Sequence, residues 1–274
     1  MKINRRNFVI RLLTGVTGIF GLLVLDGFWF EKYIISWTTY DISDREDQKI
    51  KAIQITDMHL DEIKTFHHSI AHRINQEHPD ILFITGDAIN YNNRMALLNN
   101  FLSLIDRTIY KVAILGNVEY SGDVDIQALK NLYQSHNGEL LINENCILKK
   151  GNRSLNVIGL DDYIGGKADF YQAAKNVNKS LESIVLNHCP GYRDDIERIN
   201  RSLGANIKLI LSGHTHGGQI TFFGKVLYTP GGSGRYVKGW YKSKETKMYV
   251  SKGIGTSVIP VRFWARAEAS IFYI

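Results

Sequence analysis

The sequence predicts an α/β fold preceded by an apolar amino-terminal helix, and three observations support this prediction. Short apolar runs recur from about residue 48, segments with apolar residues at helical spacing separate them, and an uncharged run lies near the amino terminus. The chain has 274 residues, of which 44% are hydrophobic, so it can bury one large core. Two cysteines, Cys146 and Cys189, exclude a disulfide-stapled domain.

Residues 1–33 are typical of a signal or membrane-anchor segment. A basic start precedes Leu12–Leu25, an uncharged run that suits the apolar region of a signal peptide and falls short of the roughly 20 residues of a membrane span. Trp29, Phe30 and Tyr33 follow, and such aromatic residues favour a membrane interface. Because no small-residue cleavage site follows, we expect the segment to remain as an anchor. The alternative is a buried amphipathic helix, which the lack of a polar face in Leu12–Leu25 disfavours.

The charges of the first residues favour one orientation in the membrane. Lys2, Arg5, Arg6 and Arg11 favour a cytoplasmic amino terminus and therefore an extracytoplasmic body. The stretch 4–9 also resembles a twin-arginine export signal.

Five apolar runs are expected as buried strands because each is short and continuous. They are Ile50–Thr56, Ile81–Thr85, Lys111–Leu115, Ser183–Asn187 and Ile207–Ser212.

Helices are expected between these strands, because apolar residues recur at helical spacing in the stretches 66–74, 97–105 and 126–133. From Gly217 on, glycine-punctuated strands such as 219–223 and 247–251 are expected. No repeat and no long polar linker follows residue 48, so residues 48–274 are expected to form one catalytic domain.

Each of the five expected strands is followed within a few residues by a side chain that can bind a metal ion. These side chains are Asp57, His59, Asp87, Asn117, His188, His214 and His216. Ligands of open α/β sheets gather beyond the carboxyl ends of strands, so we expect all seven to converge on one crevice. Turn chemistry explains a single Gly-Asp or Gly-Asn pair, but it does not require histidine or aspartate at five successive strand ends. His67 and His68 are left out, because their helix is expected to place them in water.

Two aspartates, one asparagine and four histidines predict a site for two divalent ions. This mixture of oxygen and nitrogen donors suits Mn²⁺, Fe or Zn²⁺ better than Mg²⁺ or Ca²⁺, and we favour Mn²⁺. Seven ligands are too many for one catalytic ion with an open position and fit two ions that share a carboxylate. Two ions about 3.5–4 Å apart can activate water and bind a phosphoryl oxygen during in-line displacement.

The order of these motifs resembles the calcineurin-like metallophosphoesterase superfamily. The motifs are Asp-Met-His at 57–59, Gly-Asp at 86–87, Gly-Asn at 116–117, Asn-His at 187–188 and Gly-His-Thr-His at 213–216. The patterns at 213–219, 249–256 and 260–263 are similar to a membrane-associated bacterial branch of that superfamily. Some members of the branch carry twin-arginine signals, and others resemble UDP-diacylglucosamine pyrophosphohydrolases of lipid A synthesis.

The resemblance implies a four-layer αββα sandwich and assigns a role to each ligand. Asp57, His59 and His216 would hold the first metal, and Asp87 would bridge the two. Asn117, His188 and His214 would hold the second metal. The residues expected to be catalytic are Asp87, Asn117 and His214.

The sequence departs from the family at one informative position. The usual motif is Gly-Asn-His followed by an acid, whereas this chain has Gly116, Asn117, Val118 and Glu119. Valine cannot protonate a leaving group, and losing a positioned acid costs roughly 10²–10⁴ in rate when the leaving group is poor. A phosphate leaving group needs little protonation, so the sequence favours a diester or pyrophosphate substrate over an alkyl phosphomonoester.

The formal net charge of +6 is concentrated at the two ends of the chain, residues 1–11 and 225–266, and the middle is acidic. Basic and aromatic residues alternate in 225–266, a pattern that can bind anionic lipid or single-stranded nucleic acid. The apolar amino terminus favours a membrane surface over nucleic acid, and a solvated basic face is the third alternative.

The sequence therefore predicts a membrane-associated, dinuclear metal-dependent phosphohydrolase that cleaves a phosphodiester or pyrophosphate bond. The favoured substrate is lipid-linked, such as UDP-diacylglucosamine, which would require the body on the cytoplasmic face, against the twin-arginine-like start. The alternatives are an exported phosphoesterase of broad specificity and a catalytically silent metal-containing protein that binds phosphate or lipid.

Overall fold

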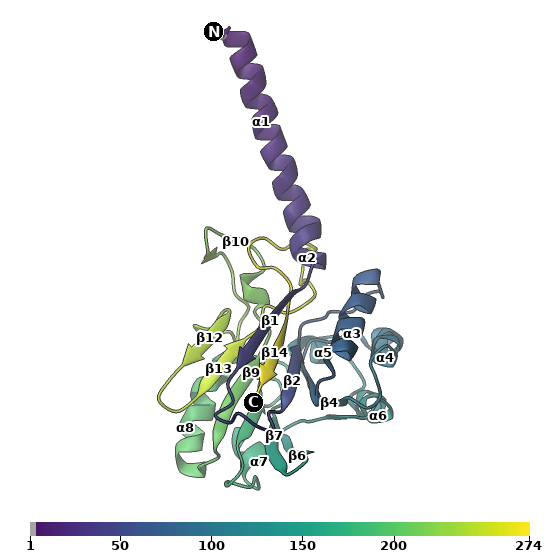
Figure 1. Cartoon of the computed structure of the whole chain (residues 1–274), viewed down its shortest axis with the longest axis vertical. Helices are drawn as coiled ribbons and strands as arrows, with labels where there is room; N and C mark the ends of the chain where they lie inside the picture. Colours follow the sequence, from purple (N-terminus) through teal and green to yellow (C-terminus); the bar gives the residue numbers. More distant parts are fainter. Residues whose placement is uncertain (1–3) are drawn as a thin grey trace.

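Two six-stranded sheets pack face to face, with helices on their outer faces and one long helix projecting from an end of the body (Figure 1). The computed structural model describes residues 4–274, so Lys2 of the basic start lies outside the described residues. The layer order is αββα, which confirms the fold that the sequence led us to expect.

The first sheet contains three of the five strands predicted from the sequence. Its order is β1 (Ser36–Asp41), β14 (Glu268–Tyr273), β2 (Lys51–Ile55), β3 (Ile81–Thr85), β4 (Tyr110–Ile114) and β5 (Gly138–Leu140). Strands β2 to β5 run parallel, and β14 is antiparallel to β2.

The second sheet contains the other two predicted strands. Its order is β12 (Gly239–Lys242), β13 (Lys247–Val250), β9 (Ile207–Ser212), β8 (Ser183–Leu186), β7 (Arg153–Gly159) and β6 (Glu144–Lys150). The four inner strands are parallel and the two edge strands are antiparallel to their neighbours. A separate hairpin is formed by β10 (Thr221–Phe222) and β11 (Lys225–Val226).

Period-two alternation in the buried strands explains the layers. Ile81 and Phe83 of β3 point into the apolar core between the sheets, whereas Leu82 and Ile84 point into the core under the helices. The outer helices of the first sheet are α3 (Thr65–Glu77), α4 (Met95–Ser103) and α6 (Ile126–Ser135), which confirm the three predicted helices. The second sheet is covered by α7 (Phe170–Ala174) and α8 (Arg193–Leu203).

The amino-terminal helix is longer than the uncharged run predicts. Helix α1 (Arg5–Leu25) continues through a π-helical turn, η1 (Asp26–Phe30), into α2 (Glu31–Tyr33), and this continuous helix is long and apolar enough to cross a membrane. Asp26 does not break it. No residue within Arg5–Leu25 is buried, which argues against the alternative of a buried amphipathic helix.

Two features differ from the sequence-based expectations. The stretch after the helix, to which no strand was assigned, forms β1 and pairs in parallel with β14. The expectation that His67 faces water is wrong: its side chain is buried, and its Nδ1 accepts a hydrogen bond from the backbone N–H of Lys64 at 2.9 Å. This contact closes the first turn of α3 and draws the ring inward, whereas His68 is exposed as expected.

Candidate dinuclear metal centre

The structure brings all seven predicted side chains together where the carboxyl ends of the inner strands of both sheets meet. Loops after β2, β3 and β4 of the first sheet and loops after β8 and β9 of the second sheet supply them. The first sheet supplies Asp57, His59, Asp87 and Asn117, and the second sheet supplies His188, His214 and His216. The site therefore spans the interface between the two sheets.

One half of the centre is formed by Asp57, His59 and His216, whose ligand atoms lie within 4.8 Å of one another. The Nε2 atoms of His59 and His216 are 3.1 Å apart, and Nε2 of His216 lies 3.6 Å from Oδ1 of Asp57. These three residues are the ones that the family resemblance assigns to the first metal.

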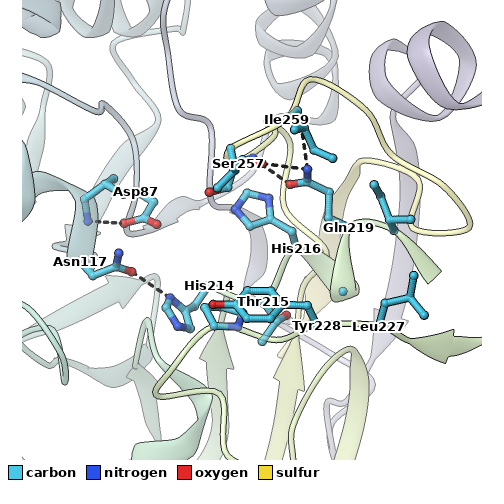
Figure 2. Close-up of a pocket in the computed structure, with 15 residues that line it drawn as sticks. Asp87, Asn117, His214, Thr215, His216, Gln219, Leu227, Tyr228, Ser257 and Ile259 are labelled. Atoms are coloured by element: carbon cyan, nitrogen blue, oxygen red, sulfur yellow. Dashed lines mark hydrogen bonds between the residues drawn. The ribbon is translucent and has the colours of Figure 1, made fainter.

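The other half contains Asn117, His188 and His214. Nδ1 of His214 lies 2.9 Å from Oδ1 of Asn117 (Figure 2). Asp87 lies between the halves, because its Oδ2 is 3.3 Å from Nε2 of His188 and 3.7 Å from Nε2 of His59. That position suits the bridging role that the resemblance implies.

Two of the four histidines, His59 and His188, are oriented by hydrogen bonds on the side away from the centre. Nδ1 of His59 pairs with Oδ1 of Asn90 at 2.6 Å, and Nδ1 of His188 pairs with the carbonyl of Thr85 at 2.8 Å. An acceptor on the outer nitrogen fixes the proton there, so the inner Nε2 atoms present lone pairs to the centre. This is how histidine is prepared as a metal ligand.

The inner atoms lack partners that the protein itself could supply. Nε2 of His188 is buried without a hydrogen-bond partner. Nε2 of His214 pairs with the carbonyl of Gly231 at 2.7 Å, which leaves the lone pair of Nδ1 facing the acceptor Oδ1 of Asn117. Buried lone pairs that face one another are unfavourable unless a cation satisfies them, so the residues fit a divalent metal.

The electrostatics of the site are dominated by burial and by the two aspartates. Burial raises the pKa of Asp57, with repulsion from Asp87 adding to the effect. Burial alone would lower the pKa of His188, but the nearby carboxylate of Asp87 raises it well above the usual value. Burial, with the guanidinium of Arg262 as a positive neighbour, lowers the pKa of His216 well below its usual range. Two buried carboxylates that raise the pKa of a neighbouring imidazole form a site with a strong preference for positive charge.

Backbone strain is concentrated at the same residues. Five of the seven have left-handed backbone conformations, with φ between 47° and 72°: Asp57, His59, Asp87, His214 and His216. Such conformations cost of order 1–3 kcal/mol each and persist where the surroundings enforce them, typically at functional sites.

Two glycines are required by close packing around these residues. A Cβ added to Gly116 would lie 2.1 Å from Oδ1 of Asp87, and one added to Gly86 would lie 2.5 Å from Nδ1 of His188. Gly86 also has φ of +91°, which side chains rarely adopt. The glycines that precede Asp87 and Asn117 therefore allow these strand-end loops to approach their neighbours.

The centre opens into a cavity of about 550 Å³. Asp87, Asn117, His214 and His216 line its polar end (Figure 2). The remaining wall is largely apolar and includes Ile220, Leu227, Tyr228, Pro230, Val258 and Ile259.

Comparison with known proteins identifies the family. Residues 50–218 match the family model described as calcineurin-like phosphoesterase. The chain belongs to this family. It is 27% identical over 289 residues to the uncharacterized metallophosphoesterase YkuE of Bacillus subtilis, covering 99% of this chain and 97% of that protein.

Two further similarities were found. The chain is 26% identical over 284 residues to a protein of Chlamydia muridarum named UDP-2,3-diacylglucosamine pyrophosphatase LpxG, covering 81% of this chain and 82% of that protein. A 5'-nucleotidase precursor from Thermus thermophilus superposes with a TM-score of 0.48 and 15% identity, covering 83% of this chain and 55% of that one. With the Asp and His clusters described above, membership of the calcineurin-like phosphoesterase family makes the chain a metal-dependent phosphoester hydrolase.

Sequence reasoning overlooked two residues that position the ligands of this calcineurin-like phosphoesterase. The buried carboxylate of Glu119 accepts hydrogen bonds from the backbone N–H groups of Asp87, Ala88, Ile89 and Gly116. The buried guanidinium of Arg262 binds the carbonyls of Lys252, Gly253, Gly255 and Ala265, and its Nη2 lies 3.4 Å from Nδ1 of His216. Both residues belong to motifs described above, at 116–119 and 260–263. No pattern in the sequence indicates that their side chains bind the backbone of loops that are distant along the chain.

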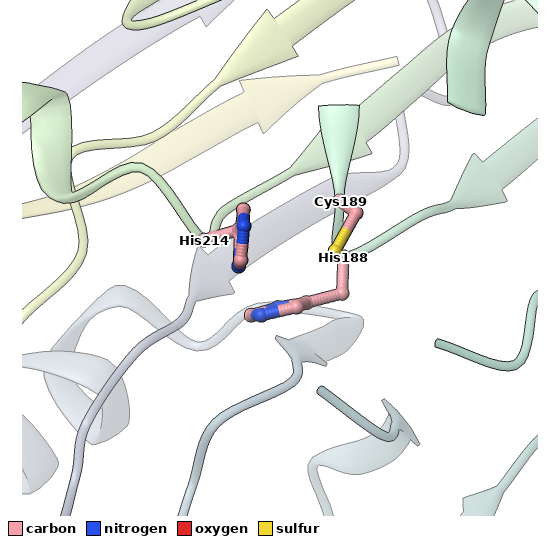
Figure 3. Close-up of side chains that lie close together, drawn as sticks. All are labelled: His188, Cys189 and His214. Atoms are coloured by element: carbon pink, nitrogen blue, oxygen red, sulfur yellow. The ribbon is translucent and has the colours of Figure 1, made fainter. Parts of the chain in front are cut away.

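Two further polar residues near the candidate ligands, Cys189 and Asp162, bind each other instead. The thiol of Cys189 lies beside His188 and His214 (Figure 3), but it donates to Oδ2 of Asp162 at 3.2 Å, and burial raises its pKa. A protonated thiol is a poor metal ligand. Asp162 also accepts hydrogen bonds from the N–H groups of Ile164 and Gly165, so its carboxylate stabilises a turn.

The basic and aromatic segment 225–266 does not form the continuous surface that its sequence suggests. Tyr236 and Tyr249 are buried, and Trp240 packs against Tyr40 and Tyr249 with ring centroids 5.1 Å away. Trp264 and Tyr228 are exposed. The alternation of basic and aromatic residues in this stretch arises partly because its strands have one buried and one exposed face.

Proposed function

We propose that this chain is a membrane-anchored phosphohydrolase that cleaves a phosphodiester or pyrophosphate bond in a lipid-linked substrate. The observation that carries the proposal is the shape of the cavity, which has ionic ligands at one end and an apolar wall along the rest. Such a cavity suits a substrate with a phosphoryl group at one end and apolar chains at the other.

The proposed ligand assignment follows the geometry. Asp57, His59 and His216 would hold one ion, Asn117, His188 and His214 would hold the second, and Asp87 lies between the two groups. Two divalent ions, with Mn²⁺ preferred, would supply Lewis-acid polarisation of the phosphoryl group and a nucleophile at neutral pH.

The protein's own contribution is positioning. Glu119 fixes the loops that carry Asp87 and Asn117, because its carboxylate binds backbone N–H groups on both. Gln219 fixes the opposite wall, because its amide binds the carbonyls of Ser257 and Ile259 at 2.9 Å and the N–H of Ser257 at 2.8 Å. Glu119 therefore positions loops at the phosphoryl end of the cavity, and Gln219 positions a loop of its apolar wall.

Val118 supports the choice of bond. Its backbone N–H donates to Oδ1 of Asp87 at 3.1 Å, and the residue lines the cavity beside the ligands. A valine here supplies no proton to a leaving group, so the reaction depends on a group that leaves readily as an anion, such as the phosphate of an anhydride.

The named relative supports the same substrate class. LpxG is named a UDP-2,3-diacylglucosamine pyrophosphatase, and that substrate combines a pyrophosphate with acyl chains. We propose UDP-2,3-diacylglucosamine as the first substrate to test.

A substrate panel with the full-length protein tests the proposal. Hydrolysis is compared for UDP-2,3-diacylglucosamine, an aryl phosphodiester and an alkyl phosphomonoester with added Mn²⁺, and Asp87→Ala serves as the inactive control. We expect the anhydride and the diester to exceed the monoester by at least about tenfold. A preference for the monoester would contradict the proposal, and bound metal without Asp87-dependent turnover of any substrate would favour a silent binding protein.

The side of the membrane is tested separately. The basic start favours an extracytoplasmic body, whereas a UDP-linked substrate requires a cytoplasmic one. Lys244 lies in the exposed β12–β13 turn, so Lys244→Cys can be labelled with a membrane-impermeant maleimide in intact cells, with the unsubstituted chain as background. Labelling in intact cells indicates an extracytoplasmic body and excludes the UDP-linked substrate in that location; labelling only after lysis indicates a cytoplasmic body.

A further inference from the structure

Large apolar side chains are exposed at the end of the body from which α1 projects. We call the following residues the apolar rim: Phe222, Phe223, Leu227, Tyr228, Val258, Ile259 and Trp264. Their exposed fractions range from 40% for Trp264 to 100% for Val258. Figure 1 shows the β10 hairpin and the loop that precedes β14 at the end of the body from which α1 projects, with the loop next to α2.

Three aromatic members of the apolar rim, Phe222, Phe223 and Trp264, form one cluster. The ring centroid of Phe223 lies 4.6 Å from that of Phe222 and 5.0 Å from that of Trp264. The rings contact one another, yet 76% of Phe223 and 58% of Phe222 remain exposed. A contiguous exposed patch of this kind is typical of a surface that contacts another apolar phase.

The backbone of the apolar rim is strained. Phe223, Val258 and Trp264 have left-handed conformations, with φ of 48°, 63° and 52°. Bulky and β-branched side chains rarely adopt this region, and burial within the protein does not compensate, because these three side chains are exposed. The loops therefore hold apolar side chains outward at a conformational cost.

The apolar rim is connected to the foot of the amino-terminal helix. The backbone N–H of Trp264 donates to the buried carboxylate of Glu31 at 2.9 Å, and the N–H of Arg262 donates to the carbonyl of Gly27 at 3.0 Å. A Cβ added to Gly27 would lie 3.0 Å from the carbonyl of Arg262, so the helix passes directly against this loop. The height of the rim relative to α1 is therefore set by the fold.

A bilayer that holds α1 must then reach the level of the apolar rim. Phe28 and Trp29, at the foot of the helix, are more than half exposed and belong to the residue types that concentrate at membrane interfaces. Lys225, the charged residue of the β10–β11 hairpin (Thr221–Val226), is exposed and suits contact with anionic headgroups.

We propose that the apolar rim inserts into the interfacial layer of the bilayer that holds α1, so that the metal-containing cavity opens onto the lipid surface. Four of its residues also line that cavity: Leu227, Tyr228, Val258 and Ile259. A lipid-linked substrate can then place its phosphoryl group at the ligands while its chains leave along the rim. This inference rests on the proposed membrane anchoring and lipid-linked substrate, and it adds the surface through which the substrate enters.

Fluorescence quenching tests the insertion without requiring any substrate. The full chain is reconstituted in phosphatidylcholine nanodiscs with or without lipids brominated near the headgroup end of the acyl chains. The contribution of Trp264 is the difference between the unsubstituted chain and Trp264→Phe. Trp240, which packs against Tyr40 and Tyr249, provides the matched control through Trp240→Phe.

We expect brominated lipid to reduce the Trp264 contribution at least about twofold and to leave the Trp240 contribution unchanged, because bromine quenches only fluorophores that enter the lipid phase. An unquenched Trp264 in nanodiscs would overturn the proposal and would indicate that another surface, such as a second copy of the chain, covers the rim. Because the readout is independent of turnover, it separates failure of this inference from failure of the proposed substrate.

A kinetic measurement provides the second readout. Phe222→Ser combined with Phe223→Ser should lower kcat/KM for a bilayer-embedded lipid substrate at least about tenfold and change hydrolysis of a soluble aryl phosphodiester less than about twofold. Tyr171→Ser, at an exposed position on α7, is the matched control. Equal losses on both substrates would contradict a role in access from the membrane.

Discussion

Val118 is the residue at which this chain departs most informatively from its family. It lines the cavity next to Asn117, where the family carries a histidine that can protonate a leaving group. We predict that Val118→His raises turnover of an alkyl phosphomonoester by about 10²-fold and changes turnover of a pyrophosphate far less, because only the poor leaving group needs the proton. Steady-state kinetics on both substrates check this. Val118→Gln, which is polar but does not titrate, should give no such gain.

Glu119 acts on the site through the backbone. Its two carboxylate oxygens accept four N–H groups from the loops of Asp87 and Gly116, so an amide at this position would direct its own N–H group toward one or more of these donors. We predict that Glu119→Gln lowers the free energy of unfolding by about 2–3 kcal/mol and weakens metal binding. Denaturant titration and metal titration measure the two effects. Unchanged metal affinity would show that Glu119 does not position the ligands.

His67 makes the stability of α3 depend on pH. Burial, with Lys64 as a positive neighbour, lowers the pKa of His67 from its usual 6.5 to about 4. The neutral ring also accepts the N–H of Lys64, and a protonated Nδ1 cannot do so. The folded state therefore disfavours protonation, so the stabilisation is complete above pH 6.5 and is lost as the pH falls toward 4.

The corresponding measurement compares the chain with His67→Gln. Between about pH 7 and pH 5, the unsubstituted chain should lose up to about 2 kcal/mol more stability than the variant, because one pKa unit corresponds to about 1.4 kcal/mol. Parallel pH dependences in urea denaturation would contradict this assignment.

At the scale of elements, the strands that are buried on both faces were the ones predicted most accurately from the sequence. β3 and β9 were located residue for residue because parallel central strands are continuous apolar runs. β1 was missed because Ser36–Asp41 is a half-buried edge strand without an apolar run, and its partner β14 lies more than 200 residues away along the chain. The seven candidate ligands could be predicted because each lies within a few residues of the end of a buried strand. Glu119 and Arg262 could not, because their roles depend on loops that meet only in the folded chain.

The connection between α2 and the loop before β14 leads to a prediction about this element. The carboxylate of Glu31 accepts the N–H groups of Trp264 and Ala265, both at 2.9 Å, and is buried. We predict that Glu31→Ala leaves two buried donors unsatisfied and lowers the free energy of unfolding by about 1–3 kcal/mol. It should also increase proteolytic cleavage within 255–266. Asp26→Asn, on the same helix, is the control, and equal cleavage in both variants would contradict the anchoring role.

At the scale of the whole molecule, the basic residues at the two ends of the sequence do not form one basic surface, because they lie in separate parts of the fold. Several lysines of the carboxyl-terminal segment lie on or near the β12–β13 hairpin, at 242, 244 and 247, whereas Lys225 lies on the β10–β11 hairpin beside the apolar rim. The amino-terminal arginines lie in the first turns of α1, at the end that projects away from the body (Figure 1). The net charge therefore describes three separate regions, of which the helix and the rim point to a membrane.

The metal centre connects the two halves of the sandwich, and this gives a prediction for the whole molecule. Asp57, His59, Asp87 and Asn117 come from the first sheet, whereas His188, His214 and His216 come from the second. Bound ions would cross-link the sheets and relieve the repulsion between the buried carboxylates of Asp57 and Asp87. Both effects stabilise only the folded state, because the unfolded chain does not bring these ligands together.

We therefore predict that removing metal with a chelator lowers the stability of the entire body, whereas Mn²⁺ at 100 times its Kd raises the free energy of unfolding by about 2.7 kcal/mol. Calorimetry of the full chain in detergent, with and without chelator, measures the shift as a change in Tm. Asp87→Ala should abolish most of the shift, because it removes the carboxylate that contacts both halves. Val118→Leu, which keeps every ligand, should retain it. A chelator effect of equal size in Asp87→Ala would place the stabilising ions elsewhere in the chain.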